Sequence, residues 1–397
     1  MSLGSKELFH SNFWAWLMRK NPYMINVFFD ETIKSVEKGD SGNFILNGNT
    51  VNPDKLIQRE DNHKDITINL GGKVYIIENK IKTLPYKEQL LKYQYSEKNF
   101  ERGCYTGLKD PEFDESEVTF EINKKMHTEK FEHEKWHFLN YQDISKKILS
   151  IINKHKFFDD FEETIVKQYC SDIANLNYII SEKLKSDKGS FAFETDKNLA
   201  EIGLDDVYKK LKADKIMREI ESHIKIKDEI ENGFTFKIEK GFSHNMPLLS
   251  FKYIYKYTNS DKNVYSIGVQ IQDGQFRRYV ETKAGALKKA NGSRDNMFKY
   301  FSNDLRWFDA NYEKNKNLKW LYENGVEIEH ETSMTPQKNK YKDSTKYNNF
   351  DDFIHQFYNI KENTAIDKLT EEINDNLRYA KRMLKDVKNF FADVSEE

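Results

Sequence analysis

The sequence of 397 residues lacks most of the features that secreted and membrane proteins depend on. It contains only two cysteines, Cys104 and Cys170, too few for a disulfide framework or a structural zinc site. No segment approaches the roughly 20 consecutive apolar residues of a membrane-spanning helix, and the N-terminus has no apolar signal region. We therefore expect a cytoplasmic protein with free thiols and no membrane partner.

An excess of charge of one sign is also missing. The 63 Lys and Arg residues nearly balance the 65 Asp and Glu residues, for a net charge of -2. A chain balanced in this way has no overall attraction to nucleic acid. Any surface that binds nucleic acid must therefore come from local segregation of the charges.

The length predicts two domains, because single hydrophobic cores stop growing well below 397 residues. The clearest boundary is the polar segment 185–198, rich in Ser, Lys, Asp and Gly. We predict a first domain over 1–187 and a second over 199–397. The first has helices, a hairpin and further strands in an order that predicts an α/β core, with a mixed sheet flanked by helices. The second has the pattern of an α+β domain of unknown role, for which binding of substrate or a partner is a candidate.

The most informative stretch of the first domain is a predicted β-hairpin. Apolar residues alternate with polar ones over 66–70, Gly71 and Gly72 supply a tight turn, and an apolar strand covers 74–77. Folding the chain about the centre of this turn places residues whose numbers sum to 143 opposite each other.

Three ionisable side chains meet at the open end of this hairpin. Asp65 lies opposite Glu78, and Lys80 follows on the same face of the second strand. Two carboxylates suit Mg²⁺ or Mn²⁺, and a lysine beside them can hold or help deprotonate the attacking water and neutralise charge in the transition state. The group indicates metal-assisted phosphodiester hydrolysis. The alternative is a solvated cluster of cross-strand charges.

The same residues carry a resemblance to a known family. Asp65 followed by Glu78-Asn79-Lys80 resembles the D-(x)n-E-x-K signature of the PD-(D/E)XK nuclease superfamily, with Lys64 in place of the signature's proline. The resemblance implies a restriction-endonuclease-like core and a Mg²⁺- or Mn²⁺-dependent nuclease, with DNA favoured over RNA as the substrate. It further implies that Asp65 and Glu78 bind the metal with the Asn79 carbonyl as a further ligand, and that Lys80 positions the water.

Two helices extend the resemblance over roughly the first 185 residues. Gln89 and Tyr93 resemble the Q-x-x-x-Y motif of the RecB-like branch, which implies that they orient the substrate strand. Alternatively, they form a helix face packed on the sheet. The segment 7–17 is similar to the first helix of an uncharacterised bacterial PD-(D/E)XK family, in which Glu7 matches a glutamate that faces the metal. As an acid in the first turn, Glu7 equally suits the helix dipole.

Basic residues provide further candidates for substrate binding. Arg59 precedes the hairpin and either binds substrate or forms a surface ion pair with Glu60. In the second domain, the segment 275–294 contains a single acid and is a candidate phosphate-binding surface or a solvated face. Its basic residues are Arg277, Arg278, Lys283, Lys288, Lys289 and Arg294.

Two alternatives concern the whole protein. Apolar residues at heptad-like intervals over 366–391 predict a C-terminal helix, which either packs on its own domain or forms the seam of a homo-oligomer.

The competing function is a catalytically silent nuclease fold that serves as a nucleic-acid-binding or protein-interaction module. The intact set of two acids and a lysine argues against silence.

Overall fold

The computed structural model of the chain divides into two units, each with a hydrophobic core of its own. The first unit comprises residues 1–187 and 195–211, and the second comprises 188–194 and 212–397. The structure describes residues 7–81, 85–113, 115, 117–186, 190–191, 196–226, 230–243, 246–256, 264–272, 274–282, 297, 299–308, 319–323, 326–329, 334–336, 352–360 and 364–395. In this part of the chain, no helix combines the length and the apolarity needed to cross a membrane.

The first unit extends beyond the boundary predicted from composition. Leu199 in α7 (Lys197–Glu201), together with Leu204, is buried in the core of this unit. Val207 in α8 (Asp205–Ser222) is buried there too. The sequence predicts a second domain from residue 199, whereas the structure moves its start to 212, inside α8. The reason is that the apolar side chains that follow the polar segment 185–198 pack into the core of the first unit.

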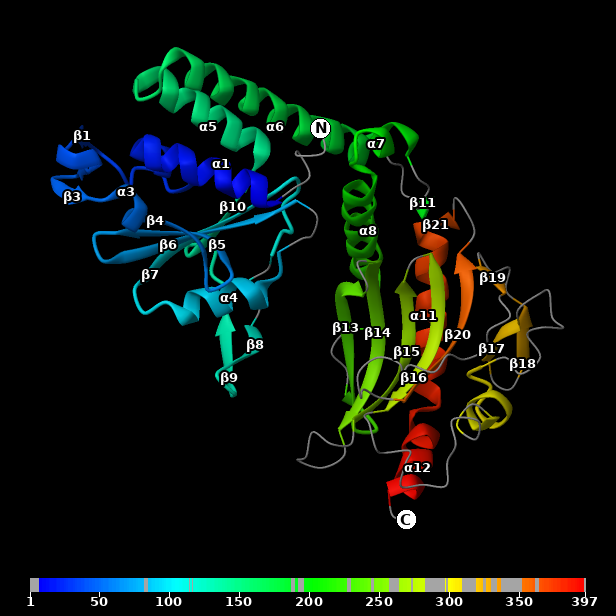
Figure 1. The fold of residues 1–397 in the computed structure, drawn as a ribbon. Coiled ribbons are helices and arrows are strands. Elements are labelled where there is room, and N and C mark those ends of the chain that lie inside the picture. The colour runs from blue at the N-terminus through cyan, green and yellow to red at the C-terminus, as the bar shows by residue number, and fades with distance from the viewer. Residues whose placement is uncertain are drawn as a thin grey trace. The chain divides into compact units, whose positions relative to one another are not determined.

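A five-stranded mixed sheet forms the centre of the first unit (Figure 1). The neighbouring strands β10, β7 and β6 are parallel, and β5 and β4 are antiparallel to their neighbours. In sheet order, the strands are β10 (Trp136–Asn140), β7 (Phe100–Gly107), β6 (Lys73–Lys80), β5 (Lys64–Leu70) and β4 (Ile57–Asp61). The predicted mixed sheet flanked by helices is confirmed.

Helices cover both faces of this sheet (Figure 1). The helices α1 (Glu7–Lys20), α5 (Tyr141–Lys154) and α6 (Asp160–Ser186) pack on one face, and α4 (Lys87–Ser96) packs on the other. The smaller elements are η1 (Pro22–Met24), α2 (Ile25–Phe28), β1 (Val36–Lys38), η2 (Asp40–Gly42), β2 (Phe44–Leu46), β3 (Asn49–Val51) and α3 (Pro53–Leu56). A further hairpin of β8 (Glu117–Ile122) and β9 (Lys125–Lys130) lies beside α4.

The helix α5 shows how local sequence sets these elements. The Asn140 side chain caps its N-terminus by accepting a hydrogen bond from the Asp143 amide. Ile144, Ile148 and Ile152 recur at intervals of four and are buried in the core. Because α5 begins directly where β10 ends, its first residue lies at the carboxyl edge of the parallel strands.

The predicted hairpin is confirmed as β5 and β6. Gly71 and Gly72 have φ angles of 59° and 77°, which a two-residue turn of this type requires. The ladder ends with Ile66 opposite Ile77. One step farther, Asp65 faces Glu78.

The second unit is a seven-stranded antiparallel sheet with helices packed on it, which confirms the predicted α+β region. In order, its strands are β12 (Ile230–Glu231), β13 (Phe234–Ser243), β14 (Met246–Lys256), β15 (Val264–Gln272), β16 (Gln275–Thr282), β20 (Asp352–Ile360) and β19 (Met334–Pro336). The remaining elements are β11 (Ser190–Phe191), η3 (Tyr300–Asp304), β17 (Lys319–Glu323), β18 (Val326–Glu329), β21 (Thr364–Ala365), α11 (Ile366–Arg382) and α12 (Leu384–Ser395).

The C-terminal helix predicted over 366–391 is two helices, α11 and α12. Leu369, Ile373 and Leu377 on α11 are fully buried in the core that the sheet of the second unit provides. The heptad-like face is therefore used within the unit. Of the two predicted alternatives, this supports packing of the helix on its own unit, because these side chains are covered by the sheet of that unit. A homo-oligomer through the C-terminal helix stays a prediction.

Candidate active site

The candidate site lies where β6 ends and β5 begins, on the face of the sheet that α4 covers. Parallel strands such as β6 and β7 place their carboxyl ends at one edge, where sites of α/β proteins are commonly built. Asp65 and Lys80 are half-buried there, whereas Glu78 is 1% exposed. The three side chains predicted from the hairpin therefore meet at one edge, two of them within reach of solvent.

Glu78 is the most constrained side chain of the group. Its Oε1 accepts hydrogen bonds from Lys80 Nζ and Gln89 Nε2, both at 2.8 Å. Its buried Oε2 has no hydrogen-bond partner among the described residues. Burial, with the negative charge of Asp65 added, raises the pKa of Glu78 to about 7. Near neutral pH, a cation that binds this carboxyl group can therefore take the place of its proton.

Lys80 carries its charge throughout the physiological range. Burial alone would lower the pKa of Lys80, but the negative charges of Glu78, Glu7 and Asp65 raise it to about 12. The backbone around it is tightly packed, because a Cβ on Gly107 would lie 2.8 Å from the Lys80 carbonyl oxygen. Only glycine allows β7 to approach at this position. Lys80 is therefore a fixed cation and a hydrogen-bond donor.

Asp65 is held by the backbone of the opposite strand. Its Oδ2 accepts a hydrogen bond of 2.8 Å from the Asn79 amide, which replaces the next step of the ladder. Burial raises the pKa of Asp65, while the Asn79 amide and Lys80 oppose that effect. The Asn79 side chain is fully buried and bonds to groups of α1, β7 and α5.

Glu7 lies beside the end of β6 from the other side. Its Oε1 accepts a hydrogen bond of 2.9 Å from the Ile81 amide, and its charge acts on both Asp65 and Lys80. The helix α1 therefore brings a third carboxylate to the edge of the site, although this carboxylate is engaged by the backbone.

Gln89 and Tyr93 of α4 both reach the site. Gln89 Nε2 donates to Glu78 Oε1 and, at 2.7 Å, to the Tyr93 hydroxyl oxygen. The Tyr93 hydroxyl donates to the His63 carbonyl at 2.7 Å, and burial raises the pKa of Tyr93 to about 12. This face of α4 thus packs on the sheet through Glu78 itself. Gln89 and Tyr93 can therefore both pack on the sheet and orient the substrate strand.

The Arg59 side chain is more buried than that of an ordinary surface ion pair. Its side chain is 13% exposed, its Nη2 lies 3.6 Å from Glu60 Oε1, and its Nε and Nη1 have no hydrogen-bond partner among the described residues. Burial lowers the pKa of Arg59, and Asp65 is the strongest of the charges that oppose this. Donors are therefore buried close to Asp65.

A divalent cation is compatible with these groups. Among the described residues, no three His, Cys, Asp or Glu side chains are arranged to hold a metal ion. Mg²⁺, however, commonly binds one or two carboxylates and completes its shell with water and substrate phosphate. Asp65 and Glu78 supply such a pair, and their mutual repulsion and the unpartnered Glu78 Oε2 are features that a cation would relieve.

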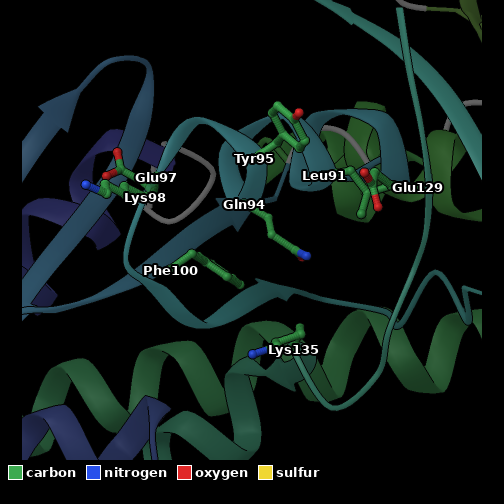
Figure 2. Close-up of a pocket in the computed structure, with 8 residues that line it drawn as sticks. All are labelled: Leu91, Gln94, Tyr95, Glu97, Lys98, Phe100, Glu129 and Lys135. Atoms are coloured by element: carbon green, nitrogen blue, oxygen red, sulfur yellow. The ribbon is translucent and has the colours of Figure 1, made fainter.

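A cavity of about 410 Å³ lies on the other side of α4 (Figure 2). Leu91, Gln94 and Tyr95 line it, whereas Gln89 and Tyr93 lie on the side of the helix that meets Glu78. The cavity is therefore separate from the candidate active site and contains none of the predicted residues.

The two arginines of the second unit that are predicted to bind substrate lie on opposite faces of its sheet. Arg278 pairs with the core residue Val269 in the ladder and is 3% exposed. Its Nε donates to Asn376 Oδ1 at 2.6 Å and its Nη1 to the Trp307 carbonyl at 2.8 Å. Burial of the guanidinium group in the core of the second unit speaks against contact with a substrate, and the role of Arg278 in substrate binding stays a prediction.

Arg277 lies on the opposite face of the same sheet and remains a prediction. Its guanidinium group bonds to the side chains of Gln270, Gln272 and Gln275. The other basic residues of this stretch lie outside the described residues, namely Lys283, Lys288, Lys289 and Arg294.

These neighbouring arginines give a matched stability test. We expect Arg278→Ala to destabilise the second unit by about 3 kcal/mol, because it leaves buried polar partners unsatisfied. Arg277→Ala, on the half-buried face, is expected to cost less than about 1 kcal/mol. Hydrogen exchange of the amides of β15 and β16 measures both. Equal protection in the two variants would contradict the buried role of Arg278.

Sequence reasoning missed three residues that hold the site. Lys64 is 1% exposed and its Nζ lies 2.5 Å from Glu97 Oε1, which joins the start of β5 to the segment after α4. Thr106 and Tyr141 both donate to Asn79 Oδ1. The signal that could have found Tyr141 is its position directly after the apolar segment that forms β10, since parallel strands end at a common edge.

Comparisons with known proteins bear on the first unit. A family model described as the PD-(D/E)XK nuclease superfamily matches residues 1–171, which include every candidate residue of the site around Glu78. Neither the curated proteins nor the solved structures gave a match. With its mixed sheet and its D…E-x-K residues at one edge, the segment 1–171 of this chain is similar to the PD-(D/E)XK nuclease superfamily, whose model it matches.

Proposed function

We propose that the protein is a Mg²⁺- or Mn²⁺-dependent nuclease that hydrolyses phosphodiester bonds of DNA through the site around Glu78. The observation that supports this most strongly is the buried Glu78. One of its oxygens is held by Lys80 and Gln89, and the other has no hydrogen-bond partner among the described residues. Asp65 stands opposite, in a segment that is similar to a superfamily of nucleases.

Asp65 and Glu78 are the proposed metal ligands, with the Asn79 carbonyl as a further ligand and Glu7 in the outer shell. A bound cation would polarise the phosphate and acidify a water molecule. Glu78 is the ligand most sensitive to acid, because burial raises its pKa to about 7. Metal binding should therefore require deprotonation of this group.

Lys80 acts as a cation rather than as a base, because its pKa is about 12. It would hold the attacking water and donate hydrogen bonds to the oxygens that gain negative charge in the transition state. Its anchor on Glu78 Oε1 keeps the ammonium group beside the metal ligand.

The substrate strand would contact the groups that flank these residues. Arg59 has buried donors without a partner among the described residues, and a phosphate oxygen would satisfy them. Gln89 and Tyr93 would orient both Glu78 and the strand, because Gln89 already contacts Glu78.

One experiment tests the proposal directly. Linear and circular double-stranded DNA, single-stranded DNA and RNA are incubated with the protein and with its Lys80→Ala variant, with and without Mn²⁺. We expect cleavage of DNA only by the wild type and only with Mn²⁺. Cleavage without a divalent metal, or cleavage by the variant at a rate close to that of the wild type, would refute the assignment.

One observation favours a second function, a catalytically silent module that binds nucleic acid or protein. It is the lack, among the described residues, of three acidic or imidazole side chains arranged for a metal. A silent module should gain no thermal stability from Mn²⁺, whereas a functional site should be stabilised by the bound ion.

A further inference from the structure

A buried polar network lies directly behind the Glu78–Lys80 segment, on the opposite face of the sheet. At its centre is the Asn79 side chain, which is 0% exposed. Asn79 Nδ2 donates to the Glu7 carbonyl at 2.9 Å, and Asn79 Oδ1 accepts from Thr106 Oγ1 at 2.9 Å and from the Tyr141 hydroxyl at 2.5 Å. One amide thus joins α1, β7 and α5 to the end of β6.

The side chains of this network are fully buried, which strengthens their hydrogen bonds. Thr106 and Tyr141 are also 0% exposed. The Tyr141 ring is fixed by the rings of His10 and Trp14, whose centroids lie at 5.1 and 5.7 Å. A buried amide without water depends on such partners, so removing one donor leaves a deficit that solvent cannot repair.

The network acts on the site through strand geometry. Successive side chains of a strand point to opposite faces, so a fixed Asn79 determines the direction in which Glu78 and Lys80 project. The Asn79 amide also donates to Asp65 Oδ2, which ties the opposite carboxylate to the same residue. Rotation of the peptide at Asn79 would therefore displace all three side chains of the site together.

We propose that Tyr141 is a positioning residue that, through Asn79, holds Glu78 and Asp65 in the orientation that binds a divalent cation. This inference rests on the proposed function of the site. Partners that orient metal ligands from behind commonly change metal affinity about 10- to 100-fold when they are removed. The effect should therefore appear in metal binding itself and not only in catalysis.

The test is Mn²⁺ binding to the full chain, measured by calorimetry, for Tyr141→Phe and a matched control. The control is Tyr169→Phe, which removes a hydroxyl from the same core, where it bonds to His10 Nδ1 at 2.9 Å and not to Asn79. We expect Tyr141→Phe to weaken Mn²⁺ binding about 10-fold and Tyr169→Phe to change it less than about 2-fold. In cleavage assays, kcat of Tyr141→Phe should fall while KM for DNA stays unchanged.

A second variant keeps the test decisive if Tyr141→Phe folds poorly. Thr106→Val removes the other donor to Asn79 Oδ1 and should weaken Mn²⁺ binding in the same direction. Wild-type affinity in both folded variants, with clear Mn²⁺ binding by the wild type, would overturn the positioning role and leave the proposed nuclease intact. A wild-type protein that binds no Mn²⁺ would refute the proposed function, and the positioning role with it.

Discussion

Alanine at Lys80 is expected to lower the rate of DNA cleavage at least about 10²- to 10³-fold without unfolding the protein. The size follows from the loss of a fixed positive donor at the developing charge of the transition state. Lys80 is half-buried, so the truncation leaves no large cavity. Asp65→Ala should have an equal or larger effect, because it removes a proposed metal ligand. Initial rates at saturating Mn²⁺, with circular dichroism to verify folding, measure both.

Lys73→Ala is the matched control for this experiment. Lys73 begins the strand that Lys80 ends, has a side chain that is 55% exposed, and pairs with Glu101 at the surface. Its replacement should leave the cleavage rate within about 2-fold of the wild type, because an exposed ion pair contributes little. Unchanged cleavage in both Lys80→Ala and Asp65→Ala would remove these residues from the mechanism.

The second large effect is a dependence of stability on pH that originates at Glu78. The pKa of Glu78 is about 7 in the folded protein against an ordinary value of 4.5. The folded state therefore keeps a proton that the unfolded chain releases between these values. This proton makes its full contribution to the free energy of unfolding below about pH 4.5, and the contribution is lost as the pH rises through 7. Its greatest value is about 3 kcal/mol.

Glu78→Gln should remove this dependence. In metal-free buffer, unfolding of the wild type in urea should require less denaturant at pH 8 than at pH 5, and the variant should show a smaller difference. Glu88→Gln, at a partly exposed position on α4, is the control and should behave like the wild type. Parallel profiles of the wild type and Glu78→Gln would contradict the raised pKa.

Mn²⁺ should reverse this loss of stability in the wild type alone. Above pH 7 Glu78 is ionised, so a cation at 100 times its dissociation constant should add about 2.7 kcal/mol to the free energy of unfolding. Below pH 6 the proton competes with the metal, and the gain should shrink. Glu78→Gln should show little gain at either pH.

Local sequence determined the hairpin and the main contacts of the site. Period-two alternation and the Gly71-Gly72 turn set the register of β5 and β6, and this register alone places Asp65 opposite Glu78. A spacing of four puts Gln89 and Tyr93 on one helix face. These features are predictable because they depend on residues that are close in sequence.

The tertiary structure decided which of these residues have which neighbours. Arg277 and Arg278 look alike in the sequence, and only the orientation of β16 toward its core buries Arg278. Tyr141 reaches Asn79 across 62 residues because β10 and β6 flank β7 in the sheet. Likewise, residues 199–211 join the first unit because its core accepts their apolar side chains. Periodicity along the chain determines faces and registers, whereas contacts between distant segments depend on how those faces pack.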